Sequence, residues 1–388
     1  MHNQSTLNLT ATRGGGKTDC DTFQSDVVKW LRFPMSVLVV FIHFSGITLT
    51  ETGIGNIIYD IIRCFLRDII SLAAVPTFFL ISGYYFFYKS HFNLAVYKQK
   101  LKKRIKTLLL PYIIWNSIML INVFSHNLWD FFANGKSLSS IIDYCREYRW
   151  FDFYWSCNEW KGRTNWLAEQ TINTSPVLGT MWFIRDLMVV VLLSPIIYWA
   201  IKNKGNLFLL LLFIINMSSI WISVPGLSDT ALFYFTIGAY FSINKKNIVY
   251  ELSKHKYIIL SLITLLLPTI IYLNGKDTAI GNIIHPFFVL VLVATYFNIA
   301  TIMVKKHYMM RFIIWGKASF FIFACHQILI LSFSDKIMLK CIPYNYWLLA
   351  TLRFILTPLL CVCICYWLFF FIHHYTPKLC RVLTGDRG

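Results

Sequence analysis

An arginine and a histidine, Arg32 and His43, stand eleven residues apart in the first apolar stretch of the chain. A helix turns by about 100° per residue, so this spacing brings both side chains to one face, with a rise of about 16 Å between them. A guanidinium binds phosphate or carboxylate groups, and an imidazole can act as a general base near neutral pH. The pair predicts a site that holds an anion at one end and moves a proton at the other.

Two further sets of polar residues lie in or beside apolar stretches. His326 follows Arg311 by fifteen residues, as His43 follows Lys29 by fourteen, so the two imidazoles are expected at similar depth. Arg185 and Asp186 come after Met181-Trp182-Phe183, with Ile184 between, near the end of another stretch. Ionisable groups at membrane depth usually face a protein interior or a water-filled cavity.

Each of these residues also has a simpler structural interpretation. Arg32 would reach the lipid phosphates, and both histidines would pack through hydrogen bonds between helices. Arg185 and Asp186 would neutralise each other at the membrane boundary. The basic stretch Lys98–Lys106, which includes Lys103, Arg104 and Lys106, either anchors the chain to anionic lipid or clamps the phosphates of a ligand.

The elements that must position these residues are membrane helices. Of the 388 residues, 57% are hydrophobic and only 14% are charged. Apolar stretches of about 20 residues recur along the chain, which is the length that a helix needs to cross a bilayer. Backbone N–H and C=O groups in lipid must form hydrogen bonds within the protein, which leaves helices or closed β-barrels. These stretches lack the alternation of apolar and polar residues that barrel strands show, so they are expected to be helices. The predicted fold is an all-α integral membrane bundle of about ten transmembrane helices.

The predicted spans cover residues 30–50, 69–88, 107–125, 181–201, 206–224, 229–243, 257–273, 281–304, 312–334 and 347–372. Every second loop between them is basic, and the positive-inside rule therefore places both termini in the cytoplasm. Residues 1–25 are expected to form a disordered cytoplasmic tail, 26–376 the transmembrane domain with an outer loop at 126–180, and 377–388 a second cytoplasmic tail.

The formal net charge of +18 is consistent with this membrane topology. The basic residues stand in short runs between apolar spans, which argues against nucleic acid as a partner. The ten cysteines show no metal-ligand spacing, and no metal site is expected. Cys145 and Cys157 lie in the outer loop and would pair only if that loop meets an oxidising compartment.

Five motifs resemble those of the membrane acyltransferase-3 family, the multi-span O-acyltransferases of bacterial surface polysaccharides. The resemblance covers about residues 26–372. The motifs are Asp26-Val-Val-Lys29 leading to Arg32 and His43, the aromatic segment Val75–Tyr84 with Ser82-Gly83, Arg104-Ile-Lys106 before Pro111-Tyr112, Met181–Leu187, and Ser319–His326. The family usually has Arg-x-x-Arg where this chain has Lys103 and Lys106, and a lysine lacks the bidentate geometry of arginine.

The resemblance implies transfer of an acyl group, most often acetyl, from acyl-coenzyme A to a hydroxyl of a carbohydrate or its lipid-linked precursor. It places the protein in the bacterial inner membrane and calls for no permanently bound cofactor. The expected catalytic residues are His43, Arg32 and His326, with His43 as general base or acyl carrier. Lys103, Arg104 and Lys106 are expected to bind the donor, and Arg185, Asp186 and Trp182 the acceptor.

Two other classes of protein remain open at this stage. A transporter or flippase for a lipid-linked sugar also places charges within its spans, although no two-fold internal similarity is visible here. A non-catalytic membrane partner in a polysaccharide assembly complex is the other alternative. The outer loop contains Trp129, Trp150, Trp155, Trp160 and Trp166, which would either stack against sugar rings or anchor the protein at the membrane interface.

Overall fold

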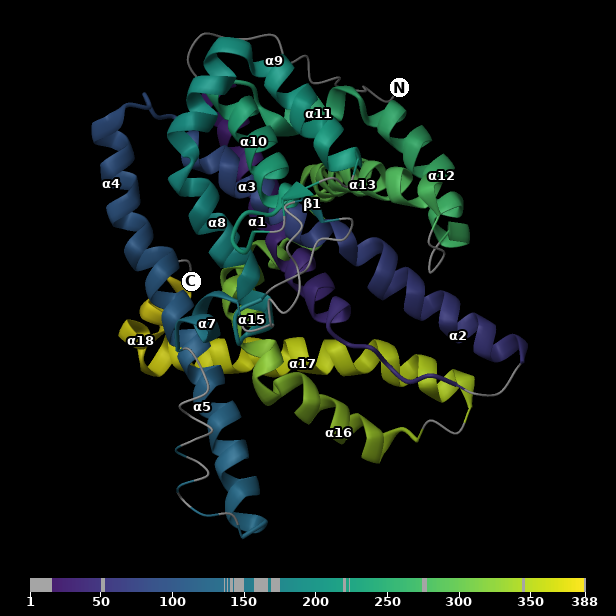
Figure 1. Ribbon diagram of the computed structural model, residues 1–388. Coiled ribbons are helices and arrows are strands. Elements are labelled where there is room, and N and C mark those ends of the chain that lie inside the picture. The colour runs from purple at the N-terminus through teal and green to yellow at the C-terminus, as the bar shows by residue number, and fades with distance from the viewer. Residues whose placement is uncertain are drawn as a thin grey trace.

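The computed structural model describes residues 16–49, 53–135, 150–156, 167–168, 175–218, 221–222, 224–273, 278–343 and 346–386, with positions 137, 139 and 142. In this part of the chain the protein is almost entirely helical (Figure 1). Two short strands, β1 (Leu167–Ala168) and β2 (Trp221–Ile222), form one antiparallel pair. The prediction of a helical membrane protein is confirmed.

Three long runs of consecutive helical segments, each called a rod below, contain most of the residues of the site. The first runs through α2 (Ile54–Cys64), the π-helical η1 (Phe65–Ile69), η2 (Ile70–Ala73) and α3 (Ala74–Phe87). The second runs through α4 (Leu94–Arg104), the π-helical η3 (Ile105–Leu109) and α5 (Leu110–Ala133). The third runs through α14 (Arg311–Trp315), η5 (Gly316–Ala318), α15 (Ser319–Cys325), the π-helical η6 (His326–Ile330) and α16 (Leu331–Cys341).

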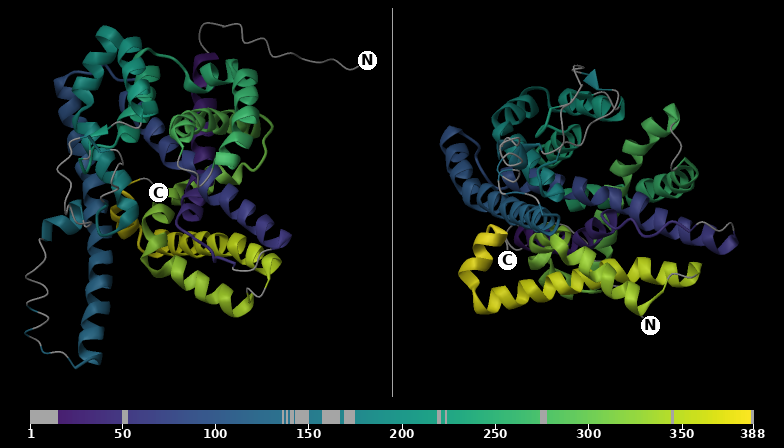
Figure 2. Two further views of the ribbon diagram at one scale, coloured as in Figure 1. Left: turned by 45° about the vertical axis from the view of Figure 1, so that its right-hand side comes forward. Right: turned by 60° about the horizontal axis from the view of Figure 1, so that its bottom comes forward.

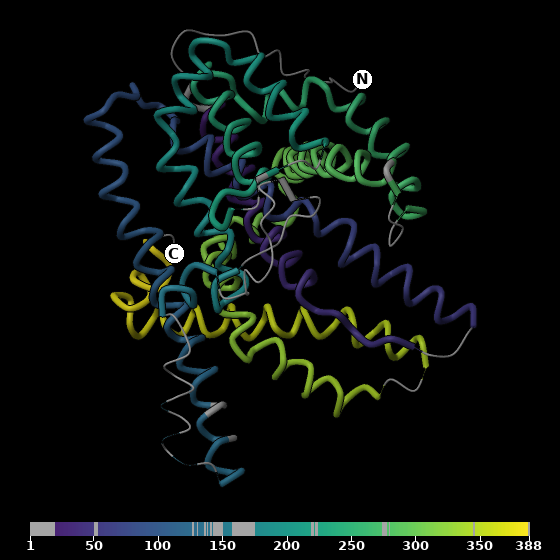
Figure 3. The backbone as a smooth tube through the Cα atoms, in the orientation of Figure 1, coloured from purple at the N-terminus to yellow at the C-terminus, as the bar shows by residue number. Residues whose placement is uncertain are grey.

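The other helices complete the bundle around α1 (Gly16–Ile42). They are α7 (Trp150–Trp155), η4 (Gly179–Met181), α8 (Trp182–Leu192), α9 (Ser194–Ser218), α10 (Asp229–Ile243), α11 (Ile248–Lys254), α12 (Lys256–Leu273), α13 (Ala279–Lys305), α17 (Trp347–Tyr375) and α18 (Pro377–Thr384). Helix α1 packs against α3, α13, α14, α15 and α17, so it occupies the centre. Helix α5 projects beyond the rest, and α2, α16 and the start of α17 extend to the side opposite α4, whereas α17 ends beside α18 (Figures 2 and 3).

Seven helices of the described chain are long and apolar enough to cross a membrane, whereas the sequence predicted about ten. They are Ile54–Phe87, Leu94–Ser125, Ser194–Ser218, Lys256–Leu273, Ile280–Lys305, Arg311–Cys341 and Trp347–Tyr375. The three remaining predicted spans, 30–50, 181–201 and 229–243, correspond to α1, α8 and α10. The side of the membrane on which each terminus lies stays a prediction.

Two of these helices, α8 and α10, are short and largely buried, whereas α1 is long but has a polar first half. Helix α8 has 11 residues and α10 has 15, so they rise only about 16 and 22 Å. Helix α1 has polar residues throughout its first half and ends at Ile42. Both α8 and α10 bury much of their surface in the protein. The difference in count thus comes from the shortness of α8 and α10 and from the charged residues of α1, neither of which the hydropathy of a stretch reveals.

Residues near the two termini are also ordered differently from expectation. Positions 16–25, which the sequence assigned to a disordered tail, form the start of α1. The tail expected at 377–388 contains α18, whose Cys380, Leu383 and Thr384 are buried. Cys145 and Cys157, together with Trp160 and Trp166, lie outside the described residues.

Helices α3 and α10 are the most extensively packed pair in the molecule. They approach closely because glycines face the partner backbone. A Cβ on Gly238 would lie 2.0 Å from the carbonyl oxygen of Leu80, and one on Gly83 would lie 2.0 Å from that of Phe235. Small residues at such contacts let the backbones of membrane helices come together. This contact positions α3, one of the helices that line the cavity described below.

Replacing Gly238 by Ala tests the importance of this contact. The new methyl group cannot fit against the Leu80 carbonyl, so the helices must separate, and we expect a loss of stability of about 2 to 3 kcal/mol. The measurement is thermal unfolding of the detergent-solubilised protein. Gly53→Ala is the matched control, because a Cβ at Gly53 meets open space. Equal melting temperatures for the two variants would contradict the packing argument.

Candidate functional site

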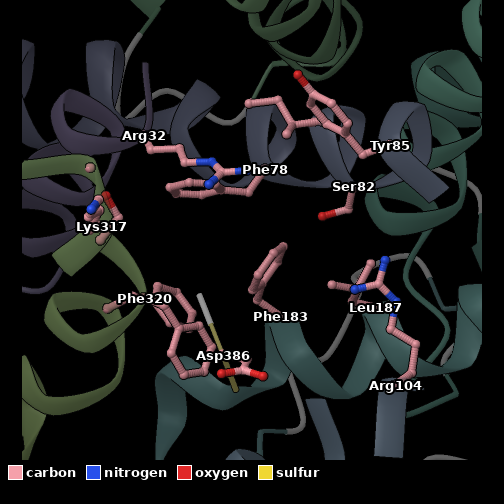
Figure 4. A pocket seen from close by; sticks show the side chains of 14 residues that line it. Arg32, Phe78, Ser82, Tyr85, Arg104, Phe183, Leu187, Lys317, Phe320 and Asp386 are labelled. Carbon is pink, nitrogen blue, oxygen red and sulfur yellow. The ribbon is translucent and has the colours of Figure 1, made fainter. Parts of the chain in front are cut away.

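A cavity of ≈ 390 Å³ lies between α1, α3, α8 and the third rod (Figure 4). Its lining residues are Arg32, Phe78, Ile81, Ser82, Tyr85, Arg104, Phe183, Leu187, Gly316, Lys317, Ser319, Phe320, Phe323 and Asp386. They come from helices that are far apart in the sequence, and one comes from the C-terminal end. The cavity therefore exists only in the folded bundle.

The charges around this cavity are unequal. Arg32, Arg104 and Lys317 contribute three positive charges, and Asp386 contributes one negative charge. In the described part of the chain none of these four side chains forms an ion pair. The guanidinium groups of Arg32 and Arg104 lie on opposite sides of the space (Figure 4). Cations held without partners in the protein attract an anion, and arginine is well suited to phosphate.

Of the three basic residues predicted from the stretch Lys98–Lys106, only Arg104 lines the cavity. Its guanidinium carbon lies 5.8 Å from the centroid of the Phe86 ring. Lys103 and Lys106 are exposed. The π-helical segment η3 begins directly after Arg104 and changes the angular spacing of the residues that follow. The segment therefore shifts Lys106 relative to Arg104, whereas Lys103 and Arg104 both lie in α4 and only packing shows which of them faces the cavity.

The two predicted histidines lie next to each other. His43 directly follows the end of α1, and His326 begins η6; their ring centroids are 5.2 Å apart. His326 is 0% exposed. Gln327, the next residue, places its side-chain nitrogen 2.7 Å from Nδ1 of His43. Two segments separated by 284 residues thus meet in one polar cluster.

Hydrogen bonds determine which nitrogen of each ring carries a proton. Nδ1 of His326 lies 2.9 Å from the carbonyl oxygen of Ile322, which can only accept, so this nitrogen carries the proton. Nε2 of His326 therefore presents a lone pair, and it has no hydrogen-bond partner in the described chain. The side-chain oxygen of Gln327 accepts from the backbone N–H of Thr180 at 3.3 Å. Its amide nitrogen consequently donates to His43.

In its neutral form, His43 then carries its proton on Nε2, because Nδ1 accepts from Gln327. The adjacent imidazoles are complementary: His326 offers a lone pair, and His43 offers an N–H group. Such a pair can take a proton from one atom and donate a hydrogen bond to another.

Neither histidine is among the residues that line the cavity. The aromatic residues Phe183 and Phe323 line the cavity, and Phe323 precedes His326 by one helical turn. The Phe183 ring contacts Phe323, with centroids 5.4 Å apart. The expectation that Arg32 and His43 open into one space is wrong for this structure, because Arg32 lines the cavity and His43 does not.

Arg185 and Asp186 form a buried ion pair. The Nη2 of Arg185 lies 3.0 Å from Oδ1 of Asp186, and the two side chains are 4% and 2% exposed. Asp186 also accepts from the backbone N–H of Ser228 at 3.2 Å, and Arg185 donates to the carbonyl of Trp155. These groups therefore join α8 to α7 and to the start of α10.

The residues beside this pair have different surroundings. Trp182 packs near Phe79, with ring centroids 6.1 Å apart. None of Trp182, Arg185 and Asp186 lines the cavity, whereas the neighbouring Phe183 and Leu187 do. The structure brings Arg32 and Arg104 to the cavity, and His43 and His326 to each other.

Several residues of the site were not singled out from the sequence. Lys317 follows Gly316 at the start of an apolar span, and a lysine in that position was a usable signal. Gln327 follows His326, and its role depends on contacts that no sequence pattern reveals. Asp386 lies in a polar terminal segment that carries no motif.

Arg67 is another residue that the sequence did not single out. It belongs to η1, and its Nε donates to the carbonyl oxygen of Ile42 at 3.3 Å. This carbonyl is at the end of α1, where helix carbonyls lack partners within the helix. Arg67 therefore holds the backbone directly before His43.

The three π-helical segments share a property. Segment η1 contains Arg67, η3 follows Arg104, and η6 begins with His326 and Gln327. In η6 the backbone departs further from helix, since Leu329 has φ 71°. Such segments are rare and often occur at functional sites. All three long rods are thus irregular where they approach the cavity or the histidines.

The chain is similar to proteins of known family. The profile of a protein family described as "Acyltransferase domain" matches residues 27–370. The chain is also similar to the succinoglycan biosynthesis protein ExoH of Rhizobium meliloti (strain 1021), with 25% identity over 215 residues. That alignment covers 54% of this chain and 52% of the relative, so the chain spans about half the length of the curated relative it matches. No solved structure matches the chain.

The ion pair of α8 supports a prediction about stability. Arg185→Met leaves the Asp186 carboxylate buried without its cation, and we expect a loss of about 3 to 5 kcal/mol. The double variant Arg185→Met, Asp186→Asn removes that charge and keeps an acceptor for Ser228. We expect it to recover at least about 1 kcal/mol of this loss in thermal unfolding. A double variant no more stable than Arg185→Met would argue against a structural role for the pair.

Proposed function

This chain belongs to the membrane acyltransferase-3 family, and on that premise we propose that it is a multi-pass membrane O-acyltransferase. It transfers a short acyl group, acetyl in the simplest case, from acyl-coenzyme A to a hydroxyl of a cell-surface carbohydrate or its lipid-linked precursor. The observation that carries this proposal is the pair of complementary imidazoles near a cavity lined by unpaired cations.

The donor is proposed to place its phosphate groups in the cavity. Arg32, Arg104 and Lys317 supply the positive charge, and Ser319 has a side-chain oxygen without a hydrogen-bond partner in the described chain. Charge-assisted bonds to phosphate are among the stronger polar interactions in proteins. The rise of about 16 Å from Arg32 to His43 is comparable to an extended pantetheine arm. In this proposal the acyl end passes Phe183 and Phe323 to reach the histidines.

The chemical step assigns different tasks to the two rings. Nε2 of His326 accepts the proton of the acceptor hydroxyl while the hydroxyl oxygen attacks the thioester carbonyl carbon. A C–O bond forms, and the carbonyl oxygen gains negative charge, which the Nε2–H of His43 stabilises by hydrogen bonding. The C–S bond then breaks, and the proton held by His326 passes to the departing thiolate. The products are an ester and free coenzyme A.

This division differs from the sequence-based hypothesis, in which His43 is the general base. The reason is geometric: a lone pair on Nε2 of His43 would put a proton on Nδ1, opposite the amide NH₂ of Gln327. Two donors would then face each other. His326 has no such conflict, because its Nδ1 proton already points to the Ile322 carbonyl.

Support for a carbohydrate acceptor comes from the relative named for succinoglycan biosynthesis. We propose that exposed aromatic residues at the end of α5 and in α7 contact this acceptor. Trp129 and Trp150 are 72% and 56% exposed, and Trp150 stacks with Phe124. Aromatic rings bind the apolar faces of sugars and also anchor proteins at membrane interfaces.

The histidines provide the first functional prediction. His43→Ala and His326→Ala are each expected to lower acyl transfer about 100- to 10,000-fold, because each removes a group that acts in the transition state. Transfer is measured with purified protein, radiolabelled acetyl-coenzyme A and a lipid-linked glycan. His373→Ala, in an exposed histidine of α17, is the matched control. Full activity of either site variant, with normal membrane insertion, removes that histidine from the mechanism.

Gln327 provides a second prediction, which addresses the tautomer of His43. Gln327→Glu places an acceptor opposite Nδ1 and moves the proton of the neutral ring away from Nε2. We expect kcat to fall about 10- to 100-fold while KM for acetyl-coenzyme A stays within about twofold, because Gln327 does not line the donor cavity. A change confined to KM would contradict the assignment.

The acyltransferase activity itself is tested in cells. Deletion of the gene should reduce the mass of the surface glycan by one or more acyl groups, and only an active copy should restore it. A transporter would instead change the amount of glycan at the surface without transferring label from acetyl-coenzyme A in vitro. That pair of results would overturn the proposed function.

A further inference from the structure

The C-terminal helix α18 is attached to the cavity wall. It directly follows α17, and its Cys380, Leu383 and Thr384 are buried, whereas Lys378 and Arg381 are exposed. The indole N–H of Trp115 donates to the carbonyl oxygen of Leu383 at 2.9 Å. Trp115 is 5% exposed, so this bond is shielded from solvent. The end of the chain is thereby held against α5.

Gly385 makes a second contact that only glycine permits. Its φ is +61°, and a Cβ at this position would lie 2.3 Å from the backbone carbonyl oxygen of Thr107. Thr107 belongs to η3, three residues after Arg104. Glycine adopts this conformation without strain and allows the backbones to touch. The contact therefore joins the chain end to the segment that carries a cation of the cavity.

The same turn directs Asp386 into the cavity. Asp386 also has a left-handed backbone, with φ 64°, and its N–H donates to the carbonyl of Arg381 at 2.9 Å. Its side chain is one of those that line the cavity (Figure 4). Two successive left-handed residues form a sharp turn, which an aspartate tolerates better than most residues. The match to the family ends at residue 370, so this part of the wall lies beyond the matched residues.

The Asp386 carboxylate differs in character from the rest of the lining. Asp386 is the one acidic side chain among the described residues that line the cavity, beside three cations. It forms no ion pair within the described part of the chain. A carboxylate only accepts hydrogen bonds and repels phosphate. Asp386 is exposed to solvent as well as lining the cavity, so its carboxylate is open to a part of a ligand that donates hydrogen bonds. Phe78 and Phe320 line the same space and offer aromatic surfaces apart from Phe183 and Phe323, which the acyl end passes.

A carboxylate together with aromatic rings matches the chemistry of an amino-bearing nucleobase. Bases stack on aromatic side chains, and Asp or Glu accepts a hydrogen bond from an exocyclic amine. We propose that the C-terminal turn is a specificity element of the donor site, in which Asp386 accepts a hydrogen bond from the exocyclic amine of the adenine of acyl-coenzyme A. This inference rests on the proposed function for the identity of the donor.

The arrangement assigns separate parts of the lining to separate parts of the ligand. Arg32, Arg104 and Lys317 attract the phosphates, and Asp386 selects the base that they accompany. Inorganic phosphate, or a nucleotide whose base lacks the amine, binds to the three cations but donates no hydrogen bond to Asp386. The competing interpretation is that Asp386 occupies the cavity as an internal anion that the donor must displace; removing it would then strengthen binding of any phosphorylated ligand.

The experiment compares equilibrium binding of coenzyme A and 1,N6-etheno-coenzyme A to the purified full-length protein. The etheno bridge removes the amine hydrogens and leaves every phosphate in place. We expect the wild-type protein to bind coenzyme A about 10-fold more tightly, and Asp386→Ala to bind both ligands with the weaker Kd, since a hydrogen bond to a charged group contributes about that much. Binding does not require turnover, so the result is independent of acyl transfer.

Two further variants separate recognition from folding. Gly385→Val prevents the approach to Thr107 and is expected to reproduce the Asp386→Ala result. Lys378→Ala, on the exposed side of α18, should keep the wild-type preference. Tighter binding of both ligands by Asp386→Ala, an unchanged preference, or failure of the wild type to bind either ligand would each overturn the inference. Absence of acyl transfer with the preference intact would instead overturn the proposed function alone.

Discussion

The hydrogen bond between Gln327 and His43 joins the end of the first helix to the interrupted part of a helix near the other end of the chain. It determines which nitrogen of His43 carries the proton, because the Gln327 oxygen is already bound to the Thr180 N–H. The adjacent His326 ring receives the opposite assignment from the Ile322 carbonyl. The chemistry of the site depends on this difference. If both rings carried the proton on the same nitrogen, both Nε2 atoms would be acceptors or both would be donors, and the site needs one of each.

Polar groups in the interior fall into two classes. Arg185 and Asp186 neutralise each other, and Gln24 donates to the hydroxyl of Tyr84 at 2.9 Å, so these groups stabilise contacts between helices. The half-buried guanidinium groups of Arg32 and Arg104 and the buried Nε2 of His326 have no such partners in the described chain, whereas Lys317 is exposed to solvent. A protein interior tolerates an unsatisfied charge only at considerable cost. We interpret the second class as groups that await a ligand.

The sequence allowed prediction of those features that depend on residue type alone. A helical membrane protein followed from hydrophobic length, and Arg32, His43 and His326 stood out as polar residues in apolar surroundings. Features that depend on packing could not be predicted from the sequence. Helices α8 and α10 are as apolar as membrane spans but short and buried, and hydropathy alone does not separate these cases. Lys103 and Arg104 both lie in α4, and only packing shows that Arg104 faces the cavity. Asp386 reaches the cavity through a turn at Gly385, and no sequence motif predicts this turn.

The central claim concerns where the two ends of the donor lie, and a cryo-electron microscopy map with a non-hydrolysable acetyl-coenzyme A analogue tests it most directly. The account predicts the phosphates between Arg32 and Arg104, and the carbonyl oxygen of the acetyl group within hydrogen-bonding distance of Nε2 of His43. It also predicts that the Phe183 and Phe323 rings separate to admit the pantetheine arm. A map in which the analogue lies elsewhere, with the imidazoles in contact with lipid or with its acyl end directed away from them, would contradict the account.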